Sequence, residues 1–382
     1  MTTIDRGALY DLVWNEPVRE VAARFGVSDT ALKKQCSSSG IPVPERGYWI
    51  KLKAGKPVVR ARLSLRAPGK AKFLSFGTLR SNCGRPVDLS TPPPTAPTFP
   101  ETLDDLRDRL VKQVGVLKPV RDLIAACLPV RRLLEADEKR RKKFLEAGYT
   151  WDAPLFDSPF EQRRLQLLNS IGHSLARHGG KLEISGAEGR HLRFNVGDQS
   201  FDGLCDHPKA KPGTWGQHAV RSGPVGPLCL EFKSHWIGEM PPAVWEDASD
   251  GKLEGQLSSI IIGALLTAEA GYRNGCMSMH QWELDRREAY AAEQVAAREE
   301  AERRERERLA LEAHQRRALL LSQAQAWRQA DDIRAFVRAV TNAPEASANS
   351  LEPWRTWALR EADCIDPLMN GSLVTAEAGE SE

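Results

Sequence analysis

Residues 17–41, PVREVAARFGVSDTALKKQCSSSGI, predict two short helices joined by a tight turn. Four apolar residues recur at helical spacing through the first half of this stretch: Val18, Val21, Ala22 and Phe25. Such spacing gives a helix one buried face. Gly26 can end this first helix, because glycine adopts positive φ without a Cβ penalty. Ser28 is then the predicted N-cap of a second helix, whose Leu32 packs in the core.

The second helix is expected to turn a polar face outward, with Cys36 packing inward in place of Gln35. The candidate base-reading residues on it are Ser28, Asp29, Thr30, Lys33, Lys34 and Ser37. The major groove of DNA admits one α-helix that carries short polar side chains and lysines, while the helix before it crosses the backbone. We therefore expect a helix-turn-helix that reads double-stranded DNA. An ordinary helical hairpin with a glycine turn is the alternative.

Residues on both sides of the hairpin extend this prediction. A third helix is predicted ahead of it, at residues 4–14, to cover its core. Behind it, residues 41–56, IPVPERGYWIKLKAGK, begin with prolines that forbid a helix. The candidate DNA contacts in this segment are Arg46, Tyr48, Trp49, Lys51, Lys53 and Lys56. Such a segment could follow the phosphate backbone or enter a minor groove. The two aromatic rings could equally close the hairpin core, and both interpretations can hold together.

The stretch that follows is strongly basic. Residues 46–80 contain ten Lys and Arg and no acidic residue, so we predict an extended basic arm rather than a separate fold. Within it, VVRARLSLR at residues 58–66 alternates apolar and polar positions, as a strand does. Residues 90–100, STPPPTAPTFP, are a proline-rich spacer that marks a domain boundary.

Length and charge agree with a module carried by a larger body. The 382 residues are enough for two or three domains, and 41% hydrophobic and 27% charged residues are ordinary for a soluble protein. The net charge of +3 hides an asymmetry, because residues 1–90 hold 16 Lys and Arg against 7 Asp and Glu, whereas the rest holds 38 against 44. A basic amino-terminal segment is the electrostatic signature of nucleic-acid binding.

The seven cysteines are scattered, without a CxxC pair or a short Cys/His cluster. This spacing argues against a zinc site and a disulfide framework, and we expect no cofactor. The amino terminus has no charged region followed by an apolar run, and no stretch approaches the roughly eighteen apolar residues of a membrane helix. We therefore expect no export signal, no membrane partner and a cytoplasmic, nucleoid-associated location.

The remaining chain predicts a mixed body and a long helix. Helical periodicity covers residues 102–115, 119–128, 130–148 and 160–180. Alternation then predicts strands at 181–186, 191–197, 199–206 and 228–236, before a helix at 252–272. This order predicts an α+β fold, mostly helical, with a small antiparallel sheet flanked by helices.

Residues 279–340 are dense in Ala, Glu and Arg, with opposite charges three and four residues apart. Such spacing supports an exposed helix through ion pairs, and apolar positions are too sparse for a clear heptad seam. We expect a solvated long helix that can pair with a second copy, giving a homo-oligomer. The predicted domains are thus a helix-turn-helix domain at 1–58, a basic arm and linker at 59–100, a body at 101–278, the long helix at 279–340, and a short closing helix with a disordered tail at 341–382.

One pattern offers an enzymatic alternative. Glu231 and Lys233 fall two apart on a predicted strand, and the strand before it carries Asp202 and Asp206. This arrangement resembles the PD-(D/E)XK nucleases, in which such residues hold a divalent metal and orient water. A motif this short also occurs by chance. No Walker loop, GxGxxG or Gly-x-Ser-x-Gly elbow is present. We predict a protein that is not an enzyme, with the targeted nuclease and an interaction scaffold as alternatives.

Residues 9–36, LYDLVWNEPVREVAARFGVSDTALKKQC, together with residues 41–56, resemble the amino-terminal module of a group of bacterial helix-turn-helix proteins, many of them uncharacterised. Residues 244–257, VWEDASDGKLEGQL, and residues 353–368, PWRTWALREADCIDPL, are loosely similar to the same group. The resemblance implies sequence-specific DNA binding. We expect this binding to serve transcription regulation, or the maintenance or movement of a mobile element. It implies little about the body.

Overall fold

The computed structural model describes residues 2–76, 87–148, 153–208, 226–233, 243–247, 251–343 and 348–372. These residues are mostly helical and include a small antiparallel sheet, so the predicted α+β class is confirmed. The chain separates into two compact units, Met1–Asp285 and Arg286–Glu382. Arg80, Cys83 and the tail beyond residue 372 lie outside the described residues, as do the predictions made for them.

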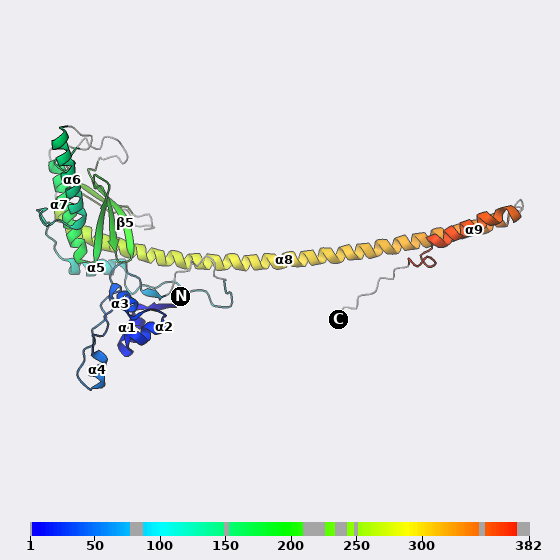
Figure 1. Ribbon diagram of the computed structural model, residues 1–382, viewed down its shortest axis with the longest axis horizontal. Coiled ribbons are helices and arrows are strands. Elements are labelled where there is room, and N and C mark those ends of the chain that lie inside the picture. Colours follow the sequence, from blue (N-terminus) through cyan, green and yellow to red (C-terminus); the bar gives the residue numbers. More distant parts are fainter. Residues whose placement is uncertain are drawn as a thin grey trace. The chain divides into compact units, whose positions relative to one another are not determined.

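The amino-terminal module, residues 2–76, is built on three helices, α1 (Arg6–Asn15), α2 (Val18–Arg24) and α3 (Asp29–Ser38) (Figure 1). The carboxylate of Asp5 caps α1 by accepting a hydrogen bond from the Gly7 N–H at 2.7 Å. The core contains side chains with no exposed surface from all three helices: Leu9, Val13, Val21, Leu32 and Cys36. The predicted lead-in helix and hairpin are therefore confirmed.

A two-stranded ribbon that the sequence analysis missed completes this core. β1 (Thr2–Asp5) pairs antiparallel with β2 (Phe73–Phe76). Leu74 and Phe76 are buried in the helical core, and the Phe76 ring stacks on Phe25 with 4.6 Å between centroids. The two segments are at the lower length limit for reading alternation, and Phe73 is apolar although it is 54% exposed. The predicted boundary at residue 58 is therefore wrong, because the module takes core residues from as far as Phe76.

Residues between α3 and β2 also differ from the prediction. Tyr48–Lys53 form a short helix, α4, between two glycines with positive φ, Gly47 at 88° and Gly55 at 68°. The strand predicted at 58–66 is wrong, because this segment has no ladder partner and no regular secondary structure. It lies along α1 instead, where the Tyr10 hydroxyl donates to the Ala61 carbonyl at 2.9 Å.

The body contains a five-stranded antiparallel meander in chain order. Its strands are β3 (Gly180–Ser185), β4 (His191–Val196), β5 (Gln199–Asp206), β6 (Cys229–Lys233) and β7 (Val244–Glu246). The four predicted strands are confirmed, and β7 is an addition too short to predict. Alternate residues of the sheet are buried on one face, so the opposite face carries the polar side chains.

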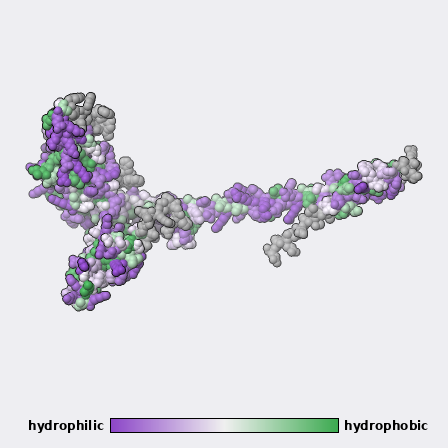
Figure 2. All heavy atoms as spheres, in the orientation of Figure 1, coloured by the Kyte–Doolittle hydropathy of each residue, from purple (hydrophilic) through white to green (hydrophobic). Residues whose placement is uncertain are grey.

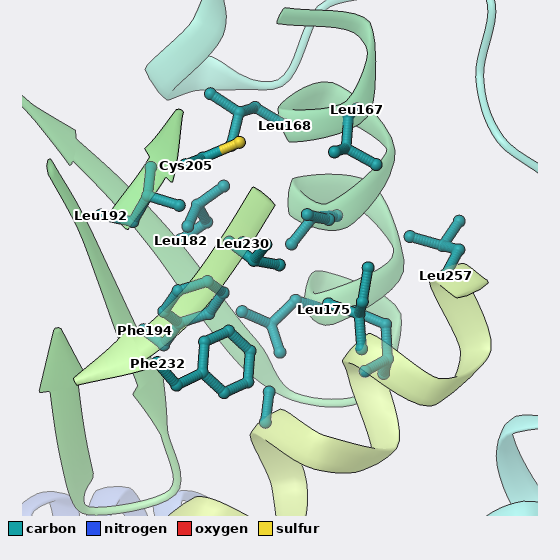
Figure 3. Close-up of a cluster of buried hydrophobic side chains, with 14 of the residues drawn as sticks. Leu167, Leu168, Leu175, Leu182, Leu192, Phe194, Cys205, Leu230, Phe232 and Leu257 are labelled. Carbon is teal, nitrogen blue, oxygen red and sulfur yellow. The ribbon is translucent and has the colours of Figure 1, made fainter. Parts of the chain in front are cut away.

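Helices cover the buried face of this sheet: α5 (Leu103–Val114), α6 (Leu128–Ala147), α7 (Pro159–Arg177), a short 3-10 turn η3 (Leu253–Gln256) and the start of α8. Figure 3 shows the side chains of α7 and α8 that meet the sheet, among them Leu168 and Leu257, which have no exposed surface. Together with Phe194 and Phe232 they form one continuous core. The helix predicted at 160–180 is confirmed as α7.

The helix predicted at 119–128 is wrong. Residues 119–127 are irregular, because polar side chains of α7 take up their backbone groups. The Ser170 hydroxyl accepts from the Val120 N–H at 2.8 Å, and the Asn169 side-chain oxygen accepts from the Cys127 N–H at 2.8 Å. These bonds replace the helical ladder that the apolar periodicity implied.

α8 runs without interruption from Leu257 to Thr341, 85 residues. The boundary predicted between residues 278 and 279 therefore falls inside a helix. Figure 2 shows hydrophilic side chains along the middle of α8. Near its end, α9 (Ala348–Ile365) packs against it, where Arg334 pairs with Asp366 at 2.8 Å. No helix in the described part of the chain is long and apolar enough to cross a membrane.

Candidate nucleic-acid interface

The turn between α2 and α3 is closed by local hydrogen bonds. Gly26 has φ +65°, and an added Cβ would meet nothing within 4 Å. Val27 donates its N–H to the Ala22 carbonyl at 3.0 Å, and the Ser28 hydroxyl accepts from the Ala31 N–H at 3.1 Å. The predicted glycine stop and serine N-cap are confirmed, and they fix the direction in which α3 leaves the turn.

The two sides of α3 separate as the spacing predicted. Leu32 and Cys36 are fully buried, and burial raises the pKa of the Cys36 thiol to about 11, so it packs as a small neutral group. The candidate base-reading residues are all exposed: Ser28, Asp29, Thr30, Lys33, Lys34 and Ser37. The structure thus brings these six side chains together on one uncovered helix surface.

The charges on this surface are mixed. Among the described residues, no acidic side chain forms an ion pair with Lys33 or Lys34, so both ammonium groups are available to a ligand. Asp29 lies in the first turn of α3, where the helix dipole favours a carboxylate. A phosphate approaching the same end would meet that negative charge, so α3 offers shape and hydrogen-bonding groups more than net charge.

Both aromatic residues after the hairpin, Tyr48 and Trp49, are half-buried. Trp14 donates its indole N–H to the Pro42 carbonyl at 2.9 Å, and its ring meets the edge of Tyr48 at 5.2 Å. Tyr48 in turn meets Trp49 edge-on at 5.2 Å. Tyr48 therefore helps to close the hairpin core, which is one of the two predicted interpretations. The cations around them are exposed: Arg46, Lys51, Lys53 and Lys56.

The predicted basic arm is not a uniform cationic surface, and this part of the prediction needs correction. Four of its basic residues pair with acidic residues elsewhere in the chain: Arg60 with Asp11, Arg66 with Glu269, Lys70 with Asp198 and Lys72 with Asp5. A count of charges along the sequence cannot see partners that only folding brings close. The cations left exposed lie mainly on α4 and on the loop after it.

Residues 66–72, which we call the docking segment, tie the module to the body. The buried carboxylate of Glu269 on α8 accepts from Arg66, from the Gly69 N–H at 3.0 Å and from Arg273 at 3.0 Å. Asp198, in the β4–β5 turn, accepts from the Ala71 N–H at 2.9 Å. Burial alone would raise the pKa of Glu269, but these hydrogen bonds outweigh it and the pKa is lowered.

Arg6 is a structural residue that the sequence analysis missed. Its guanidinium is almost buried and donates to the carbonyls of Ser39 and Gly40 at 2.8 Å and of Ser64 at 2.9 Å. It thus ties the carboxyl end of α3 to the segment leading into the docking segment, and a cation there also complements the helix dipole. No sequence pattern marks Arg6, because its acceptors are 33 to 58 residues away.

The predicted nuclease residues Asp206, Glu231 and Lys233 share a face of the sheet, and Asp206 is paired with an arginine. Asp206 pairs with Cys229 and Glu231 with Leu204 in the strand register, so the two carboxylates are offset by two residues. Asp206 accepts from Arg190 at 2.5 Å, and burial raises its pKa despite that charge. Within the described ranges, no three His, Cys, Asp or Glu side chains are placed to hold a metal ion.

The charged part of α8 carries ion pairs at the predicted spacing. Arg304 pairs with Glu300 at 2.5 Å, and Arg308 pairs with Glu312 at 2.8 Å. These side chains are exposed, so each pair adds little to stability and their value is cumulative. Exposed apolar side chains reappear toward the end of the helix, including Leu320 and Trp327.

A scan against models of protein families and searches of curated proteins and of solved structures found no match to this chain.

Proposed function

We propose that this chain binds double-stranded DNA, with α3 as the helix that enters the major groove. The observation that supports this most is the surface of α3, where the six polar side chains are uncovered while Leu32 and Cys36 hold the opposite side. Such a helix, set at a fixed angle by α2, is the arrangement that reads base edges. The role is regulation of transcription, or the maintenance or movement of a mobile element, in the cytoplasm at the nucleoid.

Affinity in this proposal comes from a small set of exposed cations. Lys33 and Lys34 on α3 and the lysines of α4 have no acidic partner among the described residues, whereas Arg66 and Lys70 are held in the docking segment. Phosphate contacts supply most non-specific affinity and make it fall with salt. The cations in the docking segment are then excluded from this surface, since their charges are neutralised within the chain.

One module covers little DNA, so useful specificity requires two copies on two half-sites. The second unit supplies a candidate for bringing them together, because α8 exposes Leu320 and Trp327 beyond its charged part. Sedimentation of the full chain at micromolar concentration tests this. A monomer before and after removal of residues 286–382 contradicts pairing through α8.

The test of DNA binding is selection from a pool of randomised duplexes, followed by fluorescence anisotropy with the recovered sequence. The double variant Lys33→Ala/Lys34→Ala removes two charges from α3. Lys142→Ala/Lys143→Ala removes the same charge from exposed positions on α6 and is the matched control. The α3 variant should lose sequence preference, as base-reading residues do, while the α6 variant keeps it. Unaltered affinity and preference in the α3 variant would contradict the assigned surface.

A further inference from the structure

α4 exposes an apolar side chain in an unusual setting. Ile50 is 75% exposed and Leu52, on the same helix, is 45% exposed; α4 lies at the far end of the loop that the chain makes after α3 (Figure 1). A lone exposed isoleucine is ordinary on a protein surface. This one stands on a braced element and is surrounded by cations, and these two features carry the argument.

The base of α4 is held from both sides. On the incoming side, Tyr48 packs on Trp14, whose indole N–H is bonded to the Pro42 carbonyl. On the outgoing side, Arg60 pairs with Asp11 of α1, and the Lys56 N–H closes the end of α4 by donating to the Lys51 carbonyl at 3.0 Å. With its neighbour Tyr48 fixed in the core, Ile50 points away from it and stays exposed.

The surroundings of Ile50 are cationic. Lys53 follows it by three residues and so lies on the same side of the helix. Lys51 and Lys56 are also exposed, without an acidic partner in the described ranges. An apolar tip with a cationic rim fits the minor groove of DNA, whose potential attracts lysine and whose base steps open to an apolar wedge.

The chain length between the two elements permits both to engage one site. Ile41 is buried in the module core, and α4 begins at Tyr48, seven residues later. Seven extended residues span at most about 25 Å. This span is shorter than one turn of B-DNA, about 34 Å, so the chain length allows α3 in a major groove and α4 in the neighbouring minor groove of one site.

We propose that Ile50 inserts between base pairs in the minor groove beside the α3 site and bends the duplex. This inference rests on the proposed DNA binding and adds a second contact element to it. The wedge partly unstacks one base step, and the lysines of α4 hold the phosphates on both sides of the bend. Pyrimidine–purine steps, which unstack most easily, should be preferred at this position.

The experiment is ligase-catalysed ring closure of a linear fragment of about 120 bp and mixed sequence, which is shorter than the persistence length and closes slowly unless it is bent. The full chain is compared with Ile50→Ser and with Leu65→Ser, an apolar residue of the same module that is 73% exposed and outside α4. The unaltered chain and Leu65→Ser should accelerate closure about tenfold, since a fixed bend replaces elastic bending. Ile50→Ser, at a concentration that saturates the DNA, should not accelerate it.

Each of the other possible results contradicts a specific part of the proposal. DNA bound by the unaltered chain without faster closure, or equal loss in both variants, overturns the wedge and leaves DNA binding in place. Failure of the unaltered chain to bind any duplex overturns the proposed function itself. The protein can also be sedimented with vesicles of phosphatidylglycerol and phosphatidylcholine. If this binding depends on Ile50 and ring closure is not accelerated, Ile50 contacts a membrane surface instead of DNA.

Discussion

Glu269→Gln should release the docking segment from the body. Glu269 is 1% exposed and neutralises Arg66 and Arg273, which are themselves largely buried. Removing one partner of a buried ion pair costs about 3 kcal/mol or more, because the remaining charges stay buried without compensation. Glutamine keeps one oxygen as an acceptor, so we take the lower value of about 3 kcal/mol for the loss in docking free energy. This loss corresponds to a roughly 100-fold larger population of molecules whose docking segment has detached.

Hydrogen exchange at single amides measures this opening directly. The amides of Gly69, Ala71 and Lys72 donate to Glu269, Asp198 and the Tyr272 hydroxyl, so they report on docking. Their exchange should accelerate about 100-fold in the variant, as the open population does. Amides of the module core, such as that of Leu32, should keep their protection. Unchanged exchange at the three docking amides would refute the reasoning.

A control and a pH series sharpen the same test. Glu283→Gln changes an exposed carboxylate on the same helix and should leave docking unaffected. The pKa of Glu269 is below its ordinary value of 4.5, so its contribution is fully present above that value and is lost as pH falls through the folded-state pKa. Docking protection in the unaltered chain should therefore decline on acidification below pH 4.5, whereas Glu269→Gln should lack this particular decline.

Three further predictions concern the body and α8. Burial raises the pKa of the Cys205 thiol to about 12. In the native protein at pH 8 this thiol should therefore not react with Ellman's reagent, which needs the thiolate, whereas the thiol of the exposed Cys364 should react. Arg190→Met should lower the free energy of unfolding by about 3 kcal/mol, because it leaves the buried Asp206 carboxylate without a cation. Arg193→Met, in the exposed pair with Asp202, should lower it by less than about 1 kcal/mol, and equal effects in urea denaturation would contradict the buried ion pair. Raising NaCl from about 0.05 to 1 M shortens the screening length to about 3 Å, so amide hydrogen exchange in residues 300–312 should become faster. Exchange that does not depend on salt would show that these ion pairs do not stabilise the helix.

Local sequence predicted the elements whose stabilising groups are close in the chain. The turn at Gly26 and the cap at Ser28 depend on residues within five positions, so both could be predicted directly. The same holds for α7 and for the strands β3 to β6, where periodicity matches burial. It failed at residues 119–127, where side chains of α7 replace the helical ladder.

The candidate DNA-binding surface also has one part that the sequence predicted and one part that it did not. The outward positions of α3 follow from helical spacing once Leu32 is assigned to the core, so the sequence by itself determined which side chains the surface presents. Which cations remain available was decided only by tertiary structure. Arg66 and Lys70 meet acidic partners 203 and 128 residues away, and no pattern within one segment records such pairs. Spacing along the chain fixes what one helix exposes, whereas ion pairs depend on distances that only folding creates.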